Sequence, residues 1–208
     1  MELSFVNVEE ARVLRIPFTA ALLSGGESRR MGRDKALIPV AWKGDVVPLW
    51  KRQLAVLEAV GPSQVIVSGS PKADYPASLK VFPDEWSHTG PLGGIATCLH
   101  HALPGLLLVL AVDVPRIEPE FLQALLRQAL PDRGVVPILQ DRFEPLIAVY
   151  PKSALPVALA QLAKNDLALQ SFASELANMR LVVSYEVPAS EQEKFENWNR
   201  PEDMHLLS

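Results

Sequence analysis

The apolar residues of this chain gather in short runs that are bounded by glycine, proline or charged residues. Four mainly apolar runs have the length of strands: residues 19–23, 64–68, 80–82 and 106–112. Runs of this kind are typical of strands that are buried on both faces of a parallel sheet. The run at 106–112 is the most apolar stretch of the chain, and we expect it to form the central strand.

Between these runs, apolar residues recur at three- and four-residue spacing, which is typical of one buried face of a helix. The clearest case begins at Pro48, which can occupy the first position of a helix, and ends at Gly61-Pro62. The segment at residues 90–95 is predicted to lead into a helix that runs through about His101, and further helices are predicted over residues 119–129, 152–164 and 166–177. The alternation of strands and helices predicts an α/β fold, with a mostly parallel central sheet flanked by helices on both faces.

An antiparallel hairpin is predicted in the second half of the chain. Residues 135–139 and 143–150 have the pattern of strands, and the polar residues Gln140-Asp141-Arg142 between them form a turn. A further strand is expected within residues 180–187, and Trp42-Lys43-Gly44 is predicted to form another turn. The hairpin would add an antiparallel part to an otherwise parallel sheet.

The length and composition indicate one soluble domain. The 208 residues, of which 49% are hydrophobic, can bury one substantial core. We predict a single domain over residues 1–208, in which residues 1–17 form an extension of unknown role. No run approaches the roughly 20 apolar residues of a membrane-spanning helix, and the first residues lack the apolar core of a secretion signal. The expected location is the cytoplasm.

Cysteine and histidine give no sign of a metal or redox site. The single cysteine, Cys98, lies in an apolar helical pattern, and we expect it to be a buried structural thiol. The histidines lack the cysteine or acidic partners and the spacing of a zinc site: His88, His100, His101 and His205. No histidine-ligated metal is therefore expected.

A glycine turn followed by a cluster of cations is the strongest chemical feature of the sequence. Residues 19–23 lead into Ser24-Gly25-Gly26, where the backbone can turn tightly and approach a ligand. Four cations follow within seven residues: Arg29, Arg30, Arg33 and Lys35. The net charge of the whole chain is −4, which argues against binding to nucleic acid. The cluster thus favours a small anion such as a polyphosphate, and a solvated basic loop is the alternative.

The spacing of this loop excludes two common nucleotide-binding motifs. Five residues separate Gly26 from Gly32, and the next two residues are Arg33 and Asp34. A P-loop instead needs four residues between its glycines, followed by lysine and then serine or threonine. The sequence contains no G-x-G-x-x-G of a dinucleotide-binding fold either. A different type of phosphate-binding loop is required if an anion binds here.

Two aspartates come just after predicted strands. Asp84 comes after residues 80–82, and Asp113 comes after the central run at 106–112. Ligands of open parallel sheets bind outside the carboxyl ends of the strands, so both carboxylates are placed for function. Asp84 can equally cap a helix or a turn. For Asp113, a charge at the end of so apolar a strand costs free energy unless it is solvated, paired or bound to a metal.

The segment at residues 22–35, LLSGGESRRMGRDK, resembles the signature L-x-G-G-x-S-x-R-M-G-x-D-K of the Rossmann-like nucleotidyltransferases, in the version found in molybdenum cofactor guanylyltransferases. Four later segments resemble the same family in the same order: Gly90 to Ile95, with Gly93 where alanine is commoner; Asp113-Val114-Pro115; Glu144 to Tyr150, with Glu144 in a variable position; and Phe195 to Asp203, with Arg200 in place of threonine. The resemblance covers the chain from about Thr19 to its end.

The resemblance implies transfer of GMP from GTP to the terminal phosphate of molybdopterin, with release of pyrophosphate. Asp113 would bind the catalytic Mg²⁺, and Lys35 would stabilise the charge that develops at the α-phosphate. Arg30 would hold the departing pyrophosphate. The implied partners are GTP and molybdopterin, with other proteins of molybdenum cofactor synthesis as further candidates, and neither nucleic acid nor a membrane.

The resemblance also implies a set of nucleotide-binding residues: Leu23, Ser24, Gly25, Lys35, Asp84 and Asp113. Two weaker candidates are Gly26 in the turn and Asn199 in the closing segment. An asparagine at position 199 can also serve as the cap of the final helix.

The base and the acceptor stay open on the sequence alone. Gly25-Gly26 favours GTP, because relatives that use CTP more often carry A-A-G at this turn. The family often has an asparagine after the second strand, however, where this chain has Ser68-Gly69-Ser70. The alternatives are a molybdopterin cytidylyltransferase, a nucleotidyltransferase acting on a sugar phosphate, and a non-catalytic nucleotide-binding regulator. The joint presence of Lys35, Asp84 and Asp113 argues against the regulator.

Overall fold

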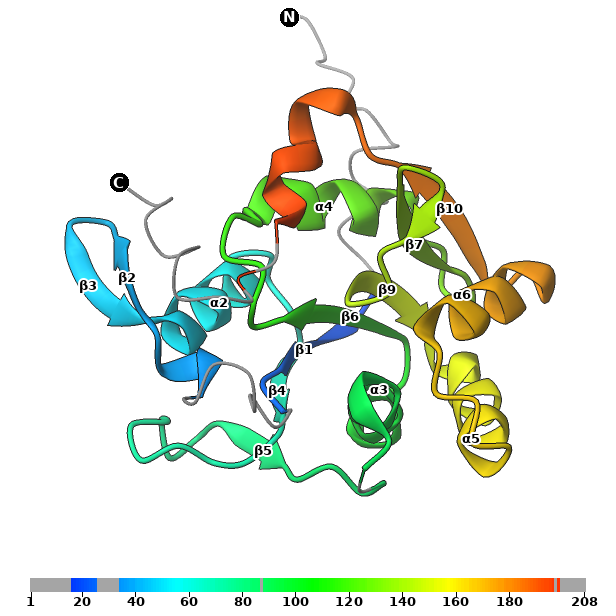
Figure 1. Cartoon of the computed structure of the whole chain (residues 1–208), viewed down its shortest axis with the longest axis horizontal. Helices are drawn as coiled ribbons and strands as arrows, with labels where there is room; N and C mark the ends of the chain where they lie inside the picture. The colour runs from blue at the N-terminus through cyan, green and yellow to red at the C-terminus, as the bar shows by residue number, and fades with distance from the viewer. Residues whose placement is uncertain (1–15, 26–33, 87, 197, 199–208) are drawn as a thin grey trace, which may run out of the picture.

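An eight-stranded sheet forms the centre of the molecule (Figure 1), as seen in a computed structural model that describes residues 16–25, 34–86, 88–196 and 198. Its strand order is β10-β7-β9-β6-β1-β4-β5, and β8 pairs with β7. The strands are β1 (Phe18–Leu23), β4 (Gln64–Ser68), β5 (Lys80–Phe82), β6 (Leu106–Ala111), β7 (Gly134–Leu139), β8 (Arg142–Phe143), β9 (Ile147–Pro151) and β10 (Val182–Glu186).

Most neighbours in this sheet are parallel, as the sequence predicted. β1 is parallel to both β4 and β6, β4 is parallel to β5, and β10 is parallel to β7. The exceptions are β9, which is antiparallel to β6 and β7, and the short strand β8, which is antiparallel to β7. The predicted antiparallel hairpin is therefore confirmed, and it is inserted into the parallel sheet.

Helices cover both faces of the sheet (Figure 1). One face packs against α2 (Leu49–Glu58), α4 (Pro119–Gln128) and the 3-10 helix η3 (Ala189–Phe195). The other face packs against α3 (Gly90–His101), α5 (Leu155–Ala163) and α6 (Leu169–Asn178). Alternate residues of β6 enter the two layers, with Leu108 on the first side and Val109 on the second. Both are fully buried, which explains why this strand is a continuous apolar run.

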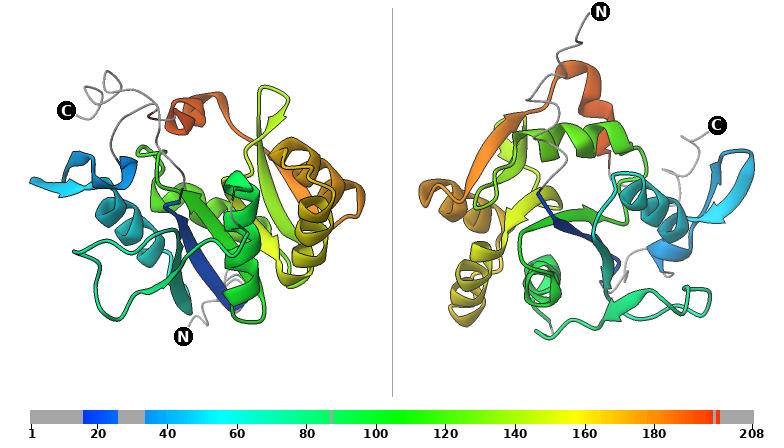
Figure 2. Two further views of the ribbon diagram at one scale, coloured as in Figure 1. Left: turned by 60° about the horizontal axis from the view of Figure 1, so that its bottom comes forward. Right: turned by 180° about the vertical axis from the view of Figure 1, so that it is seen from behind.

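A hairpin that the sequence only partly predicted follows the signature segment. β2 (Pro39–Trp42) and β3 (Asp45–Pro48) pair in antiparallel fashion and project from the rest of the molecule (Figure 2). The predicted turn is present, with φ of 52° at Lys43 and 86° at Gly44, the combination of a hairpin turn. β3 escaped prediction because it is short and places Val46 in solvent. Pro48 ends this strand, so helix α2 begins one residue later than predicted.

Local chemistry shifts the boundaries of three other predicted elements. The predicted helix at 152–164 begins with a 3-10 turn, η2 (Lys152–Ala154), and α6 begins at Leu169 instead of residue 166. The predicted strand at 143–150 is divided between β8 and β9, because Pro145 has no backbone N–H to donate. The Tyr150 hydroxyl donates to the Pro145 carbonyl at 2.6 Å and holds this break in place.

The strand order of the sheet reverses at the junction of β1 and β6. From β1 the sheet continues through β4 and β5 on one side, and through β6 and β9 on the other. The carboxyl ends of β1, β4, β5 and β6 point the same way, and open α/β sheets bind ligands outside such ends where the strand order reverses.

Cys98 is buried in α3, as predicted. Among the described residues, no helix is long and apolar enough to cross a bilayer.

Candidate functional site

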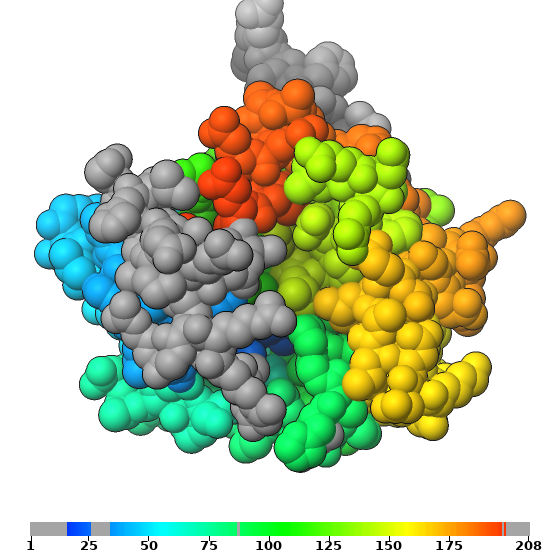
Figure 3. Space-filling model, in the orientation of Figure 1, coloured from blue at the N-terminus to red at the C-terminus, as the bar shows by residue number. Residues whose placement is uncertain are grey.

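A cavity of about 750 Å³ lies at the carboxyl ends of the parallel strands and at the start of α3. In Figure 3 a recess opens beside the green atoms of α3, and blue atoms of the first strand are visible inside it. All six predicted nucleotide-binding residues line the cavity: Leu23, Ser24, Gly25, Lys35, Asp84 and Asp113. The other predicted site residues lie outside the described part of the chain: Gly26, Arg30 and Asn199.

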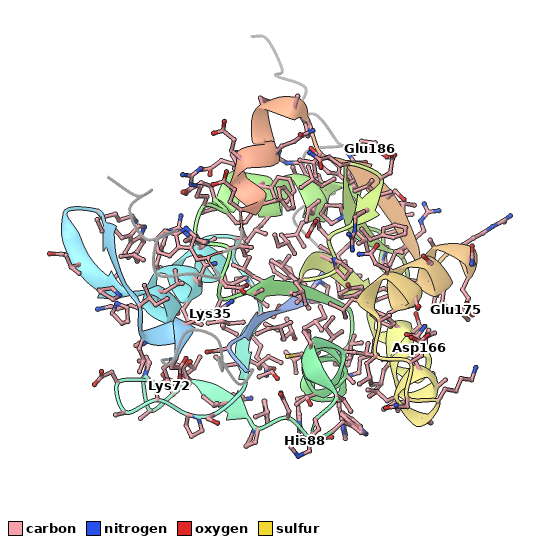
Figure 4. All side chains as sticks on the ribbon, in the orientation of Figure 1. Lys35, Lys72, His88, Asp166, Glu175 and Glu186 are labelled. Atoms are coloured by element: carbon pink, nitrogen blue, oxygen red, sulfur yellow. The ribbon has the colours of Figure 1, made fainter. Side chains whose placement is uncertain are left out.

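Lys35 and Asp113 form an ion pair in this cavity. The Lys35 Nζ lies 2.8 Å from the Asp113 Oδ2, and the two side chains are 19% and 23% exposed. Lys35 opens the 3-10 helix η1 (Lys35–Leu37), and the Asp34 side chain caps this helix by accepting a hydrogen bond from the Ala36 N–H at 3.0 Å. Figure 4 shows Lys35 between α2 and β1. The cap thus holds the signature lysine at the end of the central strands.

Buried polar contacts position the turn that carries Asp113. The Gln53 side chain, fully buried on α2, donates to the carbonyl of Ala111 at 3.2 Å and to that of Val114 at 3.0 Å. The backbone N–H of Trp198 donates to the Asp113 carbonyl at 2.9 Å. The backbone on both sides of Asp113 is therefore held by hydrogen bonds, and its carboxylate is presented to the cavity. Sequence reasoning missed Gln53, because it resembles any other polar residue of an amphipathic helix.

Asp84 contacts the ends of two other strands. The hydroxyl of Ser68, a buried residue at the end of β4, donates to Asp84 Oδ1. A side chain at Gly25 would place its Cβ 3.0 Å from Asp84 Oδ2, and one at Gly69 would place its Cβ 2.8 Å from the Gly25 nitrogen. Gly69 also has a φ of 136°, which favours glycine. The glycines allow these segments to approach closely, and Ser68-Gly69 was recognisable in the sequence only as a strand end.

The start of α3 forms another wall of the cavity. Gly90, Pro91 and Gly94 line the cavity, and the N–H groups of a first helical turn are suited to bind phosphate oxygens. A Cβ at Gly93 would lie 2.0 Å from the Thr89 Oγ1 and 3.0 Å from the Trp86 carbonyl oxygen. This crowding explains why the chain has glycine where the resembling family more often has alanine.

The segment between β4 and β5 braces Ser24 and Asp34 of the signature segment. Lys72 forms an ion pair with Asp34, and the Tyr75 hydroxyl donates to the Ser24 Oγ at 3.2 Å. The Tyr75 ring packs edge-on against Trp50 with centroids 4.7 Å apart. Burial raises the pKa of Tyr75, although the hydrogen bond to Ser24 acts against this shift. The phenol therefore remains a neutral donor, and no motif in the sequence indicated this brace.

The expectation that the histidines lack an acidic partner is wrong for His100 and His101. The structure brings Glu85, from the loop after β5, against His100 and His101 at the end of α3. One ligand atom from each of the three residues lies within 4.8 Å of the others. The sequence analysis missed this cluster because the glutamate and the histidines are brought together only when α3 packs beside the loop.

Comparison with known proteins supports the resemblance seen in the sequence. Residues 20–179 match the family described as MobA-like NTP transferase domain. A protein of Opitutus terrae named "Probable molybdenum cofactor guanylyltransferase" is 36% identical, over 88% of this chain and 91% of its own length. A protein of Xanthomonas euvesicatoria named "Molybdenum cofactor guanylyltransferase" is 34% identical, over 93% of this chain and 96% of its own length.

The fold is also shared with solved structures. The molybdopterin-guanine dinucleotide biosynthesis protein A from Archaeoglobus fulgidus superposes with a TM-score of 0.70 at 25% identity, covering 90% of this chain and 95% of the other. The similarity thus extends over nearly the whole of both chains. The chain belongs to the family of MobA-like NTP transferases.

Proposed function

We propose that this protein transfers GMP from GTP to the terminal phosphate of molybdopterin, forming a guanine dinucleotide and releasing pyrophosphate. The observation that carries the proposal is the convergence of Lys35, Asp84 and Asp113 in one cavity at the carboxyl ends of the strands. The names of the relatives at 36% and 34% identity favour this nucleotide and this acceptor.

The proposed reaction is a displacement at the α-phosphorus. An oxygen of the acceptor phosphate attacks that phosphorus, a new P–O bond forms, and the bond between the α-phosphorus and the bridging oxygen to the β-phosphate breaks. The electron pair leaves with pyrophosphate. The protein supplies positioning and charge stabilisation in such transfers. Lys35 lines the cavity, and its ammonium group lies 2.8 Å from the Asp113 carboxylate. It would stabilise the negative charge on the α-phosphate oxygens.

The donor set of the cavity fits a magnesium ion. Mg²⁺ prefers carboxylate, water and phosphate oxygens to thiolate or imidazole ligands. The carboxylate of Asp113 would hold the ion, and it already faces a cation in the form of the Lys35 ammonium group. Bound there, Mg²⁺ would neutralise charge on the phosphate oxygens. Lys35 and the ion held by Asp113 would both reduce the negative charge of the phosphate groups in the cavity.

Asp84 would select the base in this proposal. A carboxylate accepts hydrogen bonds only, and guanine offers two adjacent N–H donors on its Watson–Crick edge, whereas cytosine offers a donor only through its amino group. The Ser68 hydroxyl donates to one oxygen of Asp84 and thereby fixes the plane of the carboxylate. The proposal of GTP as substrate therefore does not require the asparagine that the family often carries after the second strand.

The test is a nucleotide panel with purified protein, Mg²⁺ and a molybdopterin acceptor. GTP, CTP and ATP are supplied separately, and pyrophosphate release is measured. Release with GTP alone supports the proposal. Release with CTP would overturn the base assignment and leave the reaction class intact. Absence of release with all three, together with Mg²⁺-dependent nucleotide binding, would favour another acceptor or a regulatory role.

A further inference from the structure

A cluster of two histidines and one glutamate lies on the surface near the nucleotide cavity but outside its lining. The Glu85 Oε1 lies 2.6 Å from the Nε2 of His101, and the Glu85 Oε2 lies 3.0 Å from the Nδ1 of His100. The side chains of Glu85 and His101 are about one third exposed, and that of His100 is 58% exposed. The three groups are therefore open to solutes from the solvent.

Contacts within the fold position the two histidine rings and the backbone of Glu85. The His101 ring stacks on Phe82 of β5, with centroids 3.7 Å apart and an interplanar angle of 6°. The His100 ring stacks in turn on His101, with centroids 4.9 Å apart. The backbone N–H of Glu85 donates to the Thr97 Oγ1 of α3 at 3.1 Å. The two imidazoles are thus stacked, and the backbone that carries the Glu85 carboxylate is held, before any ligand binds.

The ligand atoms are close enough to surround one metal ion. One atom from each residue lies within 4.8 Å of the others, whereas ligands of a tetrahedral zinc ion, at about 2.0–2.1 Å from the metal, are roughly 3.4 Å apart. Small side-chain rotations at this exposed cluster would close that difference. Two histidines and one glutamate are a known zinc ligand set with a position left for water. Mg²⁺ is disfavoured here because it prefers oxygen ligands.

We propose that Glu85, His100 and His101 bind a Zn²⁺ ion that joins the loop after β5 to the end of α3. The site is separate from the predicted magnesium ligand, because none of its three residues lines the nucleotide cavity described above. It is nevertheless adjacent to the cavity through the chain, since Glu85 follows Asp84 directly. The ion would therefore fix the backbone next to the Asp84 carboxylate, which lines the cavity. The proposal does not depend on the reaction that the cavity performs.

The test is a zinc titration of tag-free protein that has been stripped of metal with a chelator. Zn²⁺ is added in competition with a chromophoric chelator, first to the natural sequence and then to a background variant, His88→Asn with His205→Asn. Asparagine suits position 88 because His88 has a φ of 63°. We expect one equivalent of Zn²⁺ to bind in both proteins, because the background variant retains His100 and His101.

Removal of a ligand provides the decisive comparison. Adding His100→Ala, or separately Glu85→Gln, to the background variant should weaken Zn²⁺ binding by at least about 10-fold, given that even indirect partners of metal ligands contribute this much. Since His100 is largely exposed, its replacement should leave the metal-free melting temperature unchanged. Zn²⁺ should raise the melting temperature of the background protein by mass action and have little effect on the His100→Ala variant.

Two outcomes would overturn the proposal. The first is the absence of one-equivalent Zn²⁺ binding to the natural sequence. The second is one-equivalent binding that keeps its affinity after both His100→Ala and Glu85→Gln, which would place the ion elsewhere in the protein. Neither outcome would affect the nucleotide panel, because that assay contains Mg²⁺ and depends on residues of the cavity.

Discussion

The Lys35 ammonium group lies 2.8 Å from the Asp113 carboxylate and so links the signature segment to the end of the central strand. Both side chains are partly exposed, and ion pairs of this kind contribute about 1 kcal/mol or less to stability. The pair is therefore better explained by the chemistry of the cavity than by the stability of the fold.

Replacing Lys35 with alanine is expected to lower the turnover number far more than the stability. Loss of a charge-stabilising donor typically lowers the rate on the order of 100-fold or more, whereas the melting temperature should change little. The measurements are pyrophosphate release at saturating GTP and thermal denaturation. Lys51→Ala is the matched control, since Lys51 is an exposed lysine on α2. Equal rates in the two variants would contradict the role given to Lys35.

Gln53 is expected to act as a positioning residue for Asp113. Gln53→Met keeps the approximate size of the side chain but removes the donors to Ala111 and Val114. A buried polar group that loses its partner costs about 1–3 kcal/mol, so the melting temperature should fall. If Gln53 positions Asp113, the Gln53→Met variant should also need a higher Mg²⁺ concentration than the natural protein for half-maximal activity.

The control for Gln53 is a second buried glutamine. Gln161 lies on α5, and its Oε1 has no hydrogen-bond partner within the described residues. Gln161→Met should therefore leave the dependence on Mg²⁺ unchanged. If both variants have the natural Mg²⁺ dependence, Gln53 serves stability alone.

Gly69→Ala is expected to abolish tight nucleotide binding. Its φ of 136° is costly for alanine, and the added Cβ would lie 2.8 Å from the Gly25 nitrogen. Gly61→Ala separates the effect of a positive φ from that of the close contact, because Gly61 has a φ of 71° but an added Cβ there would have nothing within 4 Å. Both variants should lose roughly 1 kcal/mol of stability or more from the backbone, but only Gly69→Ala should lose nucleotide affinity in a fluorescence titration. Normal affinity in that variant would show that the glycine contact is not required.

Glu144→Gln is expected to stabilise the protein at neutral pH and not in acid. Burial raises the pKa of Glu144, and the nearby Arg142 only partly opposes this shift. In the folded state the Glu144 carboxyl therefore keeps its proton above about pH 4.3, the pKa of an unfolded glutamate. The stability of the natural protein then falls as the pH rises through the pKa of the folded state. The Glu144→Gln variant has no carboxyl group at this position, so its stability should show no such fall.

The measurement for Glu144 is the free energy of unfolding of both proteins by denaturant at several pH values. The difference in free energy of unfolding between the Glu144→Gln variant and the natural protein should increase as the pH rises from the unfolded pKa of Glu144 to its folded pKa. Above the folded pKa the difference should be constant. A difference that stays the same at all pH values would mean that the stability gain does not come from the carboxyl group.

The sequence predicted those features that depend on local pattern. The apolar run of β6 and the glycine turn after β1 could be recognised because burial on both faces and tight turning each leave a pattern in consecutive residues. The positions of Asp84 and Asp113 followed from a rule about the carboxyl ends of parallel strands. Gly25, Asp84 and Asp113 all line the cavity, together with Ala111 at the end of β6.

Features that depend on packing between distant residues could not be predicted. Gln53 contacts a carbonyl 61 residues away, and Tyr75 reaches Ser24 across 51 residues. Neither residue type is unusual in its own segment, so neither drew attention. The same reason explains why Glu85 was not seen as a partner of His101, although only 16 residues separate them.

The fate of the α-phosphate tests the proposed reaction most directly. GTP radiolabelled at the α-phosphate, and in a parallel reaction at the γ-phosphate, is incubated with the protein, Mg²⁺ and molybdopterin, and the products are separated. Our account predicts that the α-label enters the pterin dinucleotide and that the γ-label leaves as pyrophosphate. Appearance of the γ-label on the pterin, or retention of both labels in GTP that the protein demonstrably binds, would contradict it.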